Sequence, residues 1–202
     1  MNTRLETEMA CQAILDAAYG LFVQKGFHAT SMREIAKRAG VSLGAIYSHF
    51  ENKDQIYDQV LLVKLPYREI CMDLQSVSGE SLEDLIRNAA YILSREIDKD
   101  PDCLQLIFIE LNEFQDQHRP ILMETIYPQL LPFLRRIEAT QEQLRDLPPQ
   151  VILRSFLWIL LAYYRAEATI DSDGSLFTRP GRLEHYLEIF LHGVLSPRAH
   201  EN

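Results

Sequence analysis

The sequence of 202 residues lacks the features that mark membrane, secreted and metal-binding proteins. No apolar run approaches the roughly 18 residues that a helix needs to cross a bilayer, and the first residues contain no apolar signal-peptide segment. The three cysteines, Cys11, Cys71 and Cys103, form no CxxC pair and have no histidine at ligand spacing. We therefore expect a cytoplasmic protein with reduced thiols and no membrane partner, metal or cofactor. A redox-sensing thiol is the alternative for the cysteines.

Catalytic motifs are missing as well. The sequence contains no nucleophile elbow, phosphate-binding loop or zinc motif. Glu110 and Glu113 share a helix face, and Asp116 and His118 follow them, but the Glu-x-x-His pairs of di-metal helix bundles are absent. The sequence therefore argues against an enzyme.

Basic residues are few, and their distribution restricts any contact with nucleic acid. The chain has 20 Lys and Arg against 29 Asp and Glu, which gives a net charge of −9. Residues 1–56 contain six of each kind and are neutral, so residues 57–202 carry all of the negative charge. An acidic body would repel phosphates, and only the neutral N-terminal head is expected to approach DNA.

Helical periodicity runs through nearly the whole chain, and no segment alternates as a half-buried strand does. The pattern predicts an all-α fold of about nine helices. Pro66 is expected to kink or break the fourth helix, and Pro128 and Pro132 to interrupt the seventh. The predicted helices are 3–25, two short helices within 30–50, then 53–75, 81–97, 102–116, about 120–144, 151–170 and 182–195.

The segment TSMREIAKRAGVSLGAIYSHF, residues 30–50, predicts two short helices joined by a glycine turn. Ser31 and Glu34 fit a capping box at the start of the first helix. Gly40 can adopt the left-handed conformation of a sharp turn, and Ser42 begins the second helix. Such a pair is too small to bury a core alone. Its usual purpose is to place the second helix in the major groove of DNA.

A longer stretch, AILDAAYGLFVQKGFHATSMREIAKRAGVSLGAIYSHFENKDQI, resembles the N-terminal DNA-binding domain of the TetR/AcrR family of transcriptional regulators. The glycine turn, the Ile-Tyr pair and the Phe-x-x-Lys spacing all agree in register. The resemblance implies a helix-turn-helix domain at 1–56, with its motif at about 31–50. It also implies a helical body at 57–202 that binds an inducing small molecule and dimerises through its last two helices.

The function implied is that of a ligand-responsive repressor that binds a palindromic DNA operator as a homodimer. The alternatives are a helical dimeric interaction protein, or an activator, without small-molecule induction. Salt-dependent affinity for DNA would separate the regulators from the interaction protein.

The predicted DNA contacts combine the resemblance with the chemistry of the second helix. The resemblance assigns phosphate contacts to Tyr47 and Lys53 and a base contact to Arg33. No Arg, Lys, Asn or Gln lies between Val41 and Phe50, so readout from this helix would use small and apolar side chains and hydrogen bonds from Ser48 or His49. A core role for Tyr47 and a helix-end role for His49 are the alternatives. The full predicted set is Thr30, Ser31, Arg33, Ser42, Leu43, Gly44, Ala45, Tyr47, Ser48, His49 and Lys53.

The body supplies candidates for a dimer interface and a ligand pocket. The helices 151–170 and 182–195 are apolar over more of their surface than one internal face needs. The predicted dimer residues on them are Phe156, Leu160, Tyr164, Tyr186, Phe190 and Val194. Aromatic and polar groups among apolar ones, as in small-molecule sites, predict ligand contacts at Tyr67, Phe108, Asn112, Phe114, His118, Tyr127, Trp158 and Tyr163. For both sets, a purely structural place in the core is the alternative.

Overall fold

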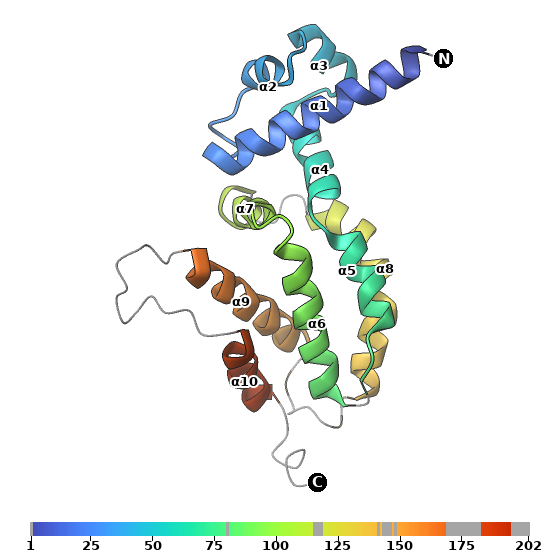
Figure 1. Ribbon diagram of the computed structural model, residues 1–202, viewed down its shortest axis with the longest axis vertical. Helices are drawn as coiled ribbons and strands as arrows, with labels where there is room; N and C mark the ends of the chain where they lie inside the picture. Colours follow the sequence, from blue (N-terminus) through green and yellow to red (C-terminus); the bar gives the residue numbers. More distant parts are fainter. Residues whose placement is uncertain are drawn as a thin grey trace. The chain divides into compact units, whose positions relative to one another are not determined.

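The structure is a computed structural model that describes residues 2–79, 81–114, 119–140, 142, 147, 149–168 and 183–194. Every regular element in these residues is helical, which confirms the predicted all-α class (Figure 1). The helices are α1 (Asn2–Lys25), α2 (Met32–Ala39), α3 (Leu43–His49), α4 (Lys53–Lys64), α5 (Tyr67–Ser76), α6 (Leu82–Ile97), α7 (Cys103–Ile109), the π-helical turn η1 (Glu110–Phe114), α8 (Arg119–Ala139), α9 (Pro149–Ala168) and α10 (Leu183–Val194).

The boundaries of the first four helices follow from local sequence signals. Gly26, with φ of 84°, ends α1 and donates its N–H to the carbonyl of Phe22 over 2.8 Å. Ser31 and Glu34 form the predicted capping box at the start of α2. Gly40 ends α2 in the left-handed conformation with φ of 70°, and Asn52 accepts the N–H of Gln55 at the start of α4.

The prolines affect the helices in two ways. Pro66 lies in the break between α4 and α5, as predicted, and the preceding Leu65 is extended with ψ of 128°. The predicted interruption at Pro128 and Pro132 is wrong, because α8 continues through both. The carbonyls that lose their donors belong to Glu124 and Pro128, four residues before each proline. Both residues are exposed, so water can hydrogen-bond to the two carbonyls.

The chain divides into two compact units, which we describe separately. Unit 1 comprises residues 1–73 and 93–131, and unit 2 comprises residues 74–92 and 132–202. Tyr57 and Leu61 of α4 and Leu106 of α7 lie in the same core as residues of α1 to α3. The buried members of that core are Ile14, Leu15, Ala17, Ala18, Leu21, Phe22, Phe27, Ile35, Ala36, Ile46, Phe50, Ile56, Tyr57, Val60, Leu61, Leu106, Ile109 and Phe114.

Unit 2 is built around α9, α10 and the first part of α6. Its buried core contains Leu82, Ile86, Ile152, Phe190, Leu191 and Val194, with Ile137, Phe156 and Ile159 packed against it. Arg87 of α6 forms ion pairs with Glu83 on its own helix and with Glu188 of α10. In the part of the chain that the structure describes, no helix is both long enough and apolar enough to span a membrane.

Candidate nucleic-acid interface

The two helices of the predicted motif are held together by a small apolar core. Ile35 and Ala36 of α2 and Ile46 of α3 are buried, and Phe50 is buried where α3 ends. The Ser42 hydroxyl accepts the N–H of Ala45 over 3.1 Å and so caps α3. The sequence therefore fixes which side of α3 faces inward, and the opposite side is left for contact with another molecule.

The outward side of α3 carries the residues that the sequence predicted there. Gly44, Tyr47 and Ser48 are exposed, and Leu43, Ala45 and His49 are half-buried. Tyr47 is 55% exposed, which excludes its alternative place in the core. The Ser48 hydroxyl donates to the carbonyl of Ala45 over 2.7 Å, so its lone pairs face outward as acceptors.

Leu43 differs from the others on this face because part of its side chain packs against the core of unit 1. Only the remaining part of Leu43 is therefore available for apolar contact with another molecule.

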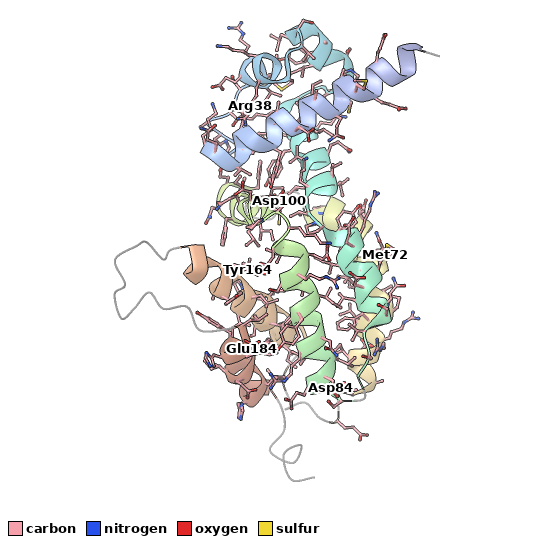
Figure 2. All side chains as sticks on the ribbon, viewed as in Figure 1. Arg38, Met72, Asp84, Asp100, Tyr164 and Glu184 are labelled. Carbon is pink, nitrogen blue, oxygen red and sulfur yellow. The ribbon has the colours of Figure 1, made fainter. Side chains whose placement is uncertain are left out.

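The basic residues of α2 lie on its exposed side. Arg33, Lys37 and Arg38 are all exposed. The Arg38 guanidinium extends across α1 beside Gly20, where an added Cβ would lie 2.6 Å from Nη2 (Figure 2). Arg38 thus packs along α1, and Arg33 and Lys37 are the two cations of α2 directed to solvent.

Two predicted DNA contacts have structural roles that the sequence did not reveal. Thr30 is only 2% exposed, and its hydroxyl donates to the carbonyl of Gly26 over 2.8 Å, so this side chain packs inside the turn. The Lys53 ammonium donates to the carbonyls of Phe27 and Thr30, each over 2.6 Å, and lies 4.0 Å from the centre of the Phe27 ring. Burial lowers its pKa. Lys53 therefore closes the turn between α1 and α2.

Glu34 links the start of α2 to the end of α1. Its carboxylate forms an ion pair with Lys25 and accepts the N–H and the hydroxyl of Ser31 over 2.9 and 2.8 Å. The bond from Lys25, with those from Ser31, lowers the pKa of Glu34 from 4.5 to about 2. Because solvent screens the charge of this exposed carboxylate, the link holds together only the neighbouring ends of α1 and α2.

We predict that Glu34→Gln destabilises the protein near neutral pH but not in strong acid. A carboxyl group whose pKa is lowered by folding stabilises the native state above its unfolded pKa of 4.5, and the stabilisation disappears as the pH falls through about 2. Urea denaturation at pH 7, 4 and 2 tests this, with Glu51→Gln, at an exposed position of the same unit, as control. A difference between Glu34→Gln and the wild type that does not shrink in acid would contradict it.

The predicted ligand contacts differ in burial and belong to both units. Phe114 belongs to the core of unit 1, Tyr127 is 47% exposed and Trp158 is 50% exposed, so none of these three lines an internal pocket. Asn112 is also exposed. His118 lies outside the described residues. The three others are buried or half-buried, namely Tyr67 and Phe108 in unit 1 and Tyr163 in unit 2.

The predicted dimer residues mostly pack within unit 2. Leu160, Tyr164, Phe190 and Val194 are each at most 8% exposed. Phe156 and Tyr186 are half-buried, and their rings lie 5.6 Å from those of Phe190 and Tyr163. In the single chain these six side chains are therefore buried or half-buried within the subunit. Among the described side chains of the two helices, the large apolar ones that are exposed include Val151, Leu153, Leu157, Trp158 and Ile189.

The cysteine thiols are held in their protonated form. Burial raises the pKa of Cys71, and burial with the nearby Asp100 and Asp102 raises that of Cys103 to about 12. Burial also raises the pKa of Cys11. Since the thiolate is the reactive form, this disfavours the redox-sensing alternative. Among the described residues, no group of three or more His, Cys, Asp or Glu could hold a metal ion.

Comparison with known proteins points to one family. Residues 14–60 match the family model described as "Bacterial regulatory proteins, tetR family". The chain is 32% identical over 148 residues to the HTH-type transcriptional regulator AcrR of Shigella flexneri, and the match covers 72% of this chain and 60% of that protein. The chain thus spans less than two thirds of that relative.

Solved structures show the same fold. A tetR family regulator from Shewanella sp. PV-4 matches with a TM-score of 0.70 at 22% identity, covering 93% of this chain and 98% of that one. SmeT, the repressor of the Stenotrophomonas maltophilia multidrug efflux pump SmeDEF, matches with a TM-score of 0.60 at 22% identity over 93% of this chain and 91% of that one. SmeT has also been solved in complex with triclosan.

Proposed function

We propose that this chain, which belongs to the TetR family of transcriptional regulators, represses transcription by binding a palindromic operator as a homodimer and is released from it by a small molecule. The family is one of regulatory proteins and not of enzymes. The observation that carries the proposal is the outward side of α3, where Gly44, Tyr47 and Ser48 are exposed on a rigidly capped helix of a charge-neutral head.

DNA binding by this head would rely on few cations. Arg33 and Lys37 are exposed on α2, while Lys53 is engaged within the head. Each phosphate neutralised releases counterions, so few contacts imply a shallow dependence of affinity on salt and a weak single head. Two heads in a two-fold dimer would sum their contacts and match two half-sites.

The second copy would bind the exposed apolar side of unit 2. Leu153, Leu157 and Trp158 of α9 and Ile189 of α10 are each between 45% and 71% exposed in the single chain. Leu153 and Leu157 are one helical turn apart and therefore share a face. An apolar surface of this kind on two neighbouring helices favours a second copy as its occupant, because a homodimer buries the same patch on both subunits.

Arg33 is the residue we assign to base recognition. It is exposed on α2, and the guanidinium can donate two parallel hydrogen bonds to a guanine. We predict that Arg33→Ala relaxes the preference at one base pair per half-site by about 1–3 kcal/mol. Sequence selection from random DNA, with wild type and variant in parallel, measures this.

Arg33→Lys is the control for Arg33→Ala, because it keeps the charge but loses the planar pair of donors. If Arg33→Lys preserves the base preference, or if Arg33→Ala weakens all sequences equally, Arg33 contacts phosphate and not a base.

The same selection tests the proposed function as a whole. It should yield an inverted repeat whose half-sites are separated by about one turn of DNA or a multiple of it. Binding of random DNA as tight as binding of the selected sequence, or no salt-dependent affinity at all, would favour the helical interaction protein instead. A selected operator whose occupation raises transcription in a reporter assay would favour the activator.

Release by a small molecule is supported by the SmeT–triclosan complex, in a protein of the same fold. Coupling requires that the ligand and the DNA favour different conformations. Titration of the selected operator with candidate ligands, triclosan included, tests it. A ligand that binds the protein tightly but leaves operator affinity unchanged would exclude this mode of release.

A further inference from the structure

A carboxylate from outside the predicted DNA-binding domain binds the turn that precedes the helix-turn-helix. Glu113 lies in the π-helical turn η1 that follows α7. Its Oε1 accepts the backbone N–H of Phe27 over 3.2 Å, and its Oε2 accepts that of His28 over 2.9 Å. The Glu113 side chain is 22% exposed; its bond to Phe27 is partly buried, and its bond to His28 is open to solvent. Charged acceptors bound to amides make hydrogen bonds that are stronger than neutral ones.

The turn itself is shaped to receive this carboxylate. Gly26 has φ of 84°, and an added Cβ at this position would lie 2.7 Å from Oε1 of Glu113. A glycine therefore meets two needs here, since it allows the left-handed backbone and leaves room for the carboxylate. The backbone conformation of Gly26 and the space beside it both match the position of the carboxylate, which indicates a specific contact.

The opposite polar groups of the same turn are bound by Lys53. Glu113 accepts hydrogen bonds from the N–H groups of Phe27 and His28, while the Lys53 ammonium donates hydrogen bonds to the carbonyls of Phe27 and Thr30. The peptide groups of the turn therefore lie between a carboxylate and an ammonium. Lys53 is the first residue of α4 and lies three residues beyond Phe50, where α3 ends. Ser31, which caps α2, directly follows the turn.

Further contacts join α7 and η1 to α4 and to the turn that follows α1. The Tyr57 hydroxyl of α4 donates to the carbonyl of Leu106 in α7 over 3.0 Å. The ring of Phe114 lies 4.5 Å from that of Phe27 and 4.8 Å from that of Tyr57. A π-helical turn has more residues per turn than an α-helix, so the neighbours Glu113 and Phe114 diverge less about its axis and both reach the same turn.

A hydrogen bond also joins the segment before α7 to α1. Asp100, which lies just before α7 (Figure 2), accepts the hydroxyl of Tyr19 in α1 over 2.8 Å. The segment from Asp100 to Phe114 is thus fixed to α1, to α4 and to the turn between α1 and α2.

From these contacts we propose that Glu113 is a positioning residue for DNA binding. Its carboxylate holds the turn at residues 26–30 in the conformation that sets α2 and α3 for the operator, and withdrawal of η1 from the turn lowers operator affinity. The inference rests on the proposed function and adds a path by which a change in the body can alter DNA binding. A signal from the body reaches the recognition helix through η1, the turn and Lys53.

The test uses Glu113→Ala in the full-length chain, with the operator selected by the wild type. We expect a loss of operator affinity of about tenfold, and faster hydrogen exchange at the amides of Phe27 and His28. Glu124→Ala, at an exposed carboxylate of the same unit, is the matched control and should change neither. The thermal midpoint is measured for each variant, because a general loss of stability would speed exchange throughout α1 as well.

A second variant tests the geometry. Gly26→Ala places a methyl group against the carboxylate, so we expect it to weaken operator binding in the wild type more than in the Glu113→Ala background. Equal effects in the two backgrounds would mean that only backbone strain matters and would overturn the proposed contact. Operator affinity unchanged in Glu113→Ala, with faster exchange at the two amides, would overturn the positioning role. A wild type without any selectable operator would instead contradict the proposed function.

Discussion

Leu157→Glu is expected to abolish tight operator binding while leaving each subunit folded. Leu157 is 45% exposed on α9 in the single chain, so a carboxylate there is solvated in the monomer. In the proposed dimer it would be buried against its own copy across the two-fold axis, and an unpaired buried charge is strongly unfavourable. The dimer should therefore dissociate.

The consequence for DNA binding follows from bivalency. Two linked heads bind two half-sites with an avidity about 10²–10⁴ times that of one head. Loss of the dimer should weaken operator binding by a factor in this range. Analytical ultracentrifugation measures the oligomeric state, and a fluorescence anisotropy titration measures the affinity for the selected operator.

Met72→Glu is the matched control for Leu157→Glu. Met72 is 70% exposed on α5 in unit 1, so the same charge is added to an exposed apolar position away from α9 and α10. We expect a dimer with nearly unchanged operator affinity. If Leu157→Glu is dimeric as well, the exposed side of unit 2 is not the interface and the proposed mode of assembly fails.

The parts of the head that were predictable from the sequence depend on local interactions. The capping box at Ser31, the left-handed Gly40 and the cap at Asn52 each involve residues at most five apart, and a linear pattern contains such signals. The burial of Ile46 and Phe50 follows from helical period alone. These signals placed α2 and α3 and the outward side of α3.

The contacts that were missed join distant residues. The bonds from Phe27 and His28 to Glu113 span 86 and 85 residues, and neither a backbone amide nor a lone carboxylate has a sequence signature. The resemblance assigned Lys53 to a phosphate, but its two carbonyl acceptors appear only when the turn is folded. Nothing local marks η1 as π-helical either, so the sequence predicted a plain helix over 102–116.

The predicted dimer residues lie on α9 and α10, and the sequence could not tell which sides of these helices pack inside the subunit. α9 is apolar nearly all round, and hydrophobic period cannot tell which side of such a helix packs inside the subunit. The structure assigns Leu160 and Tyr164 to the interior and leaves Leu153 and Leu157 exposed. A similar ambiguity explains why Trp158 was predicted as a ligand contact. An aromatic side chain suits a ligand pocket and an exposed interface equally well.

Phe22→Ala is expected to be the most destabilising of the single substitutions considered. Phe22 is fully buried in α1, and its ring lies 5.5 Å from that of Phe27 and 5.4 Å from that of Tyr57, the latter edge to face. Removing a buried phenylalanine costs about 3–5 kcal/mol, because the apolar contacts are lost and a cavity remains. That is a large part of the roughly 5–15 kcal/mol that stabilises a typical domain.

The measurement must report on unit 1. Trp158, the sole tryptophan, lies in unit 2, so its fluorescence follows the wrong part of the chain. Hydrogen exchange at the amides of α1 and α4 under increasing urea gives the free energy of opening for unit 1 alone. Val63→Ala, at a position of α4 that is 49% exposed, is the control and should change it by less than about 0.5 kcal/mol.

The same experiment distinguishes the core of the head from the contact at Glu113. Phe22→Ala should lower protection at every amide of α1 and α4, whereas Glu113→Ala should act on Phe27 and His28 alone. The reason is that Phe22 packs inside the shared core, while Glu113 binds two specific N–H groups at its edge. A change of less than about 1 kcal/mol in Phe22→Ala would mean that the aromatic cluster does not hold unit 1 together. The hydrogen bonds that join α1 to Asp100 and α4 to α7 would then have to stabilise unit 1 by themselves.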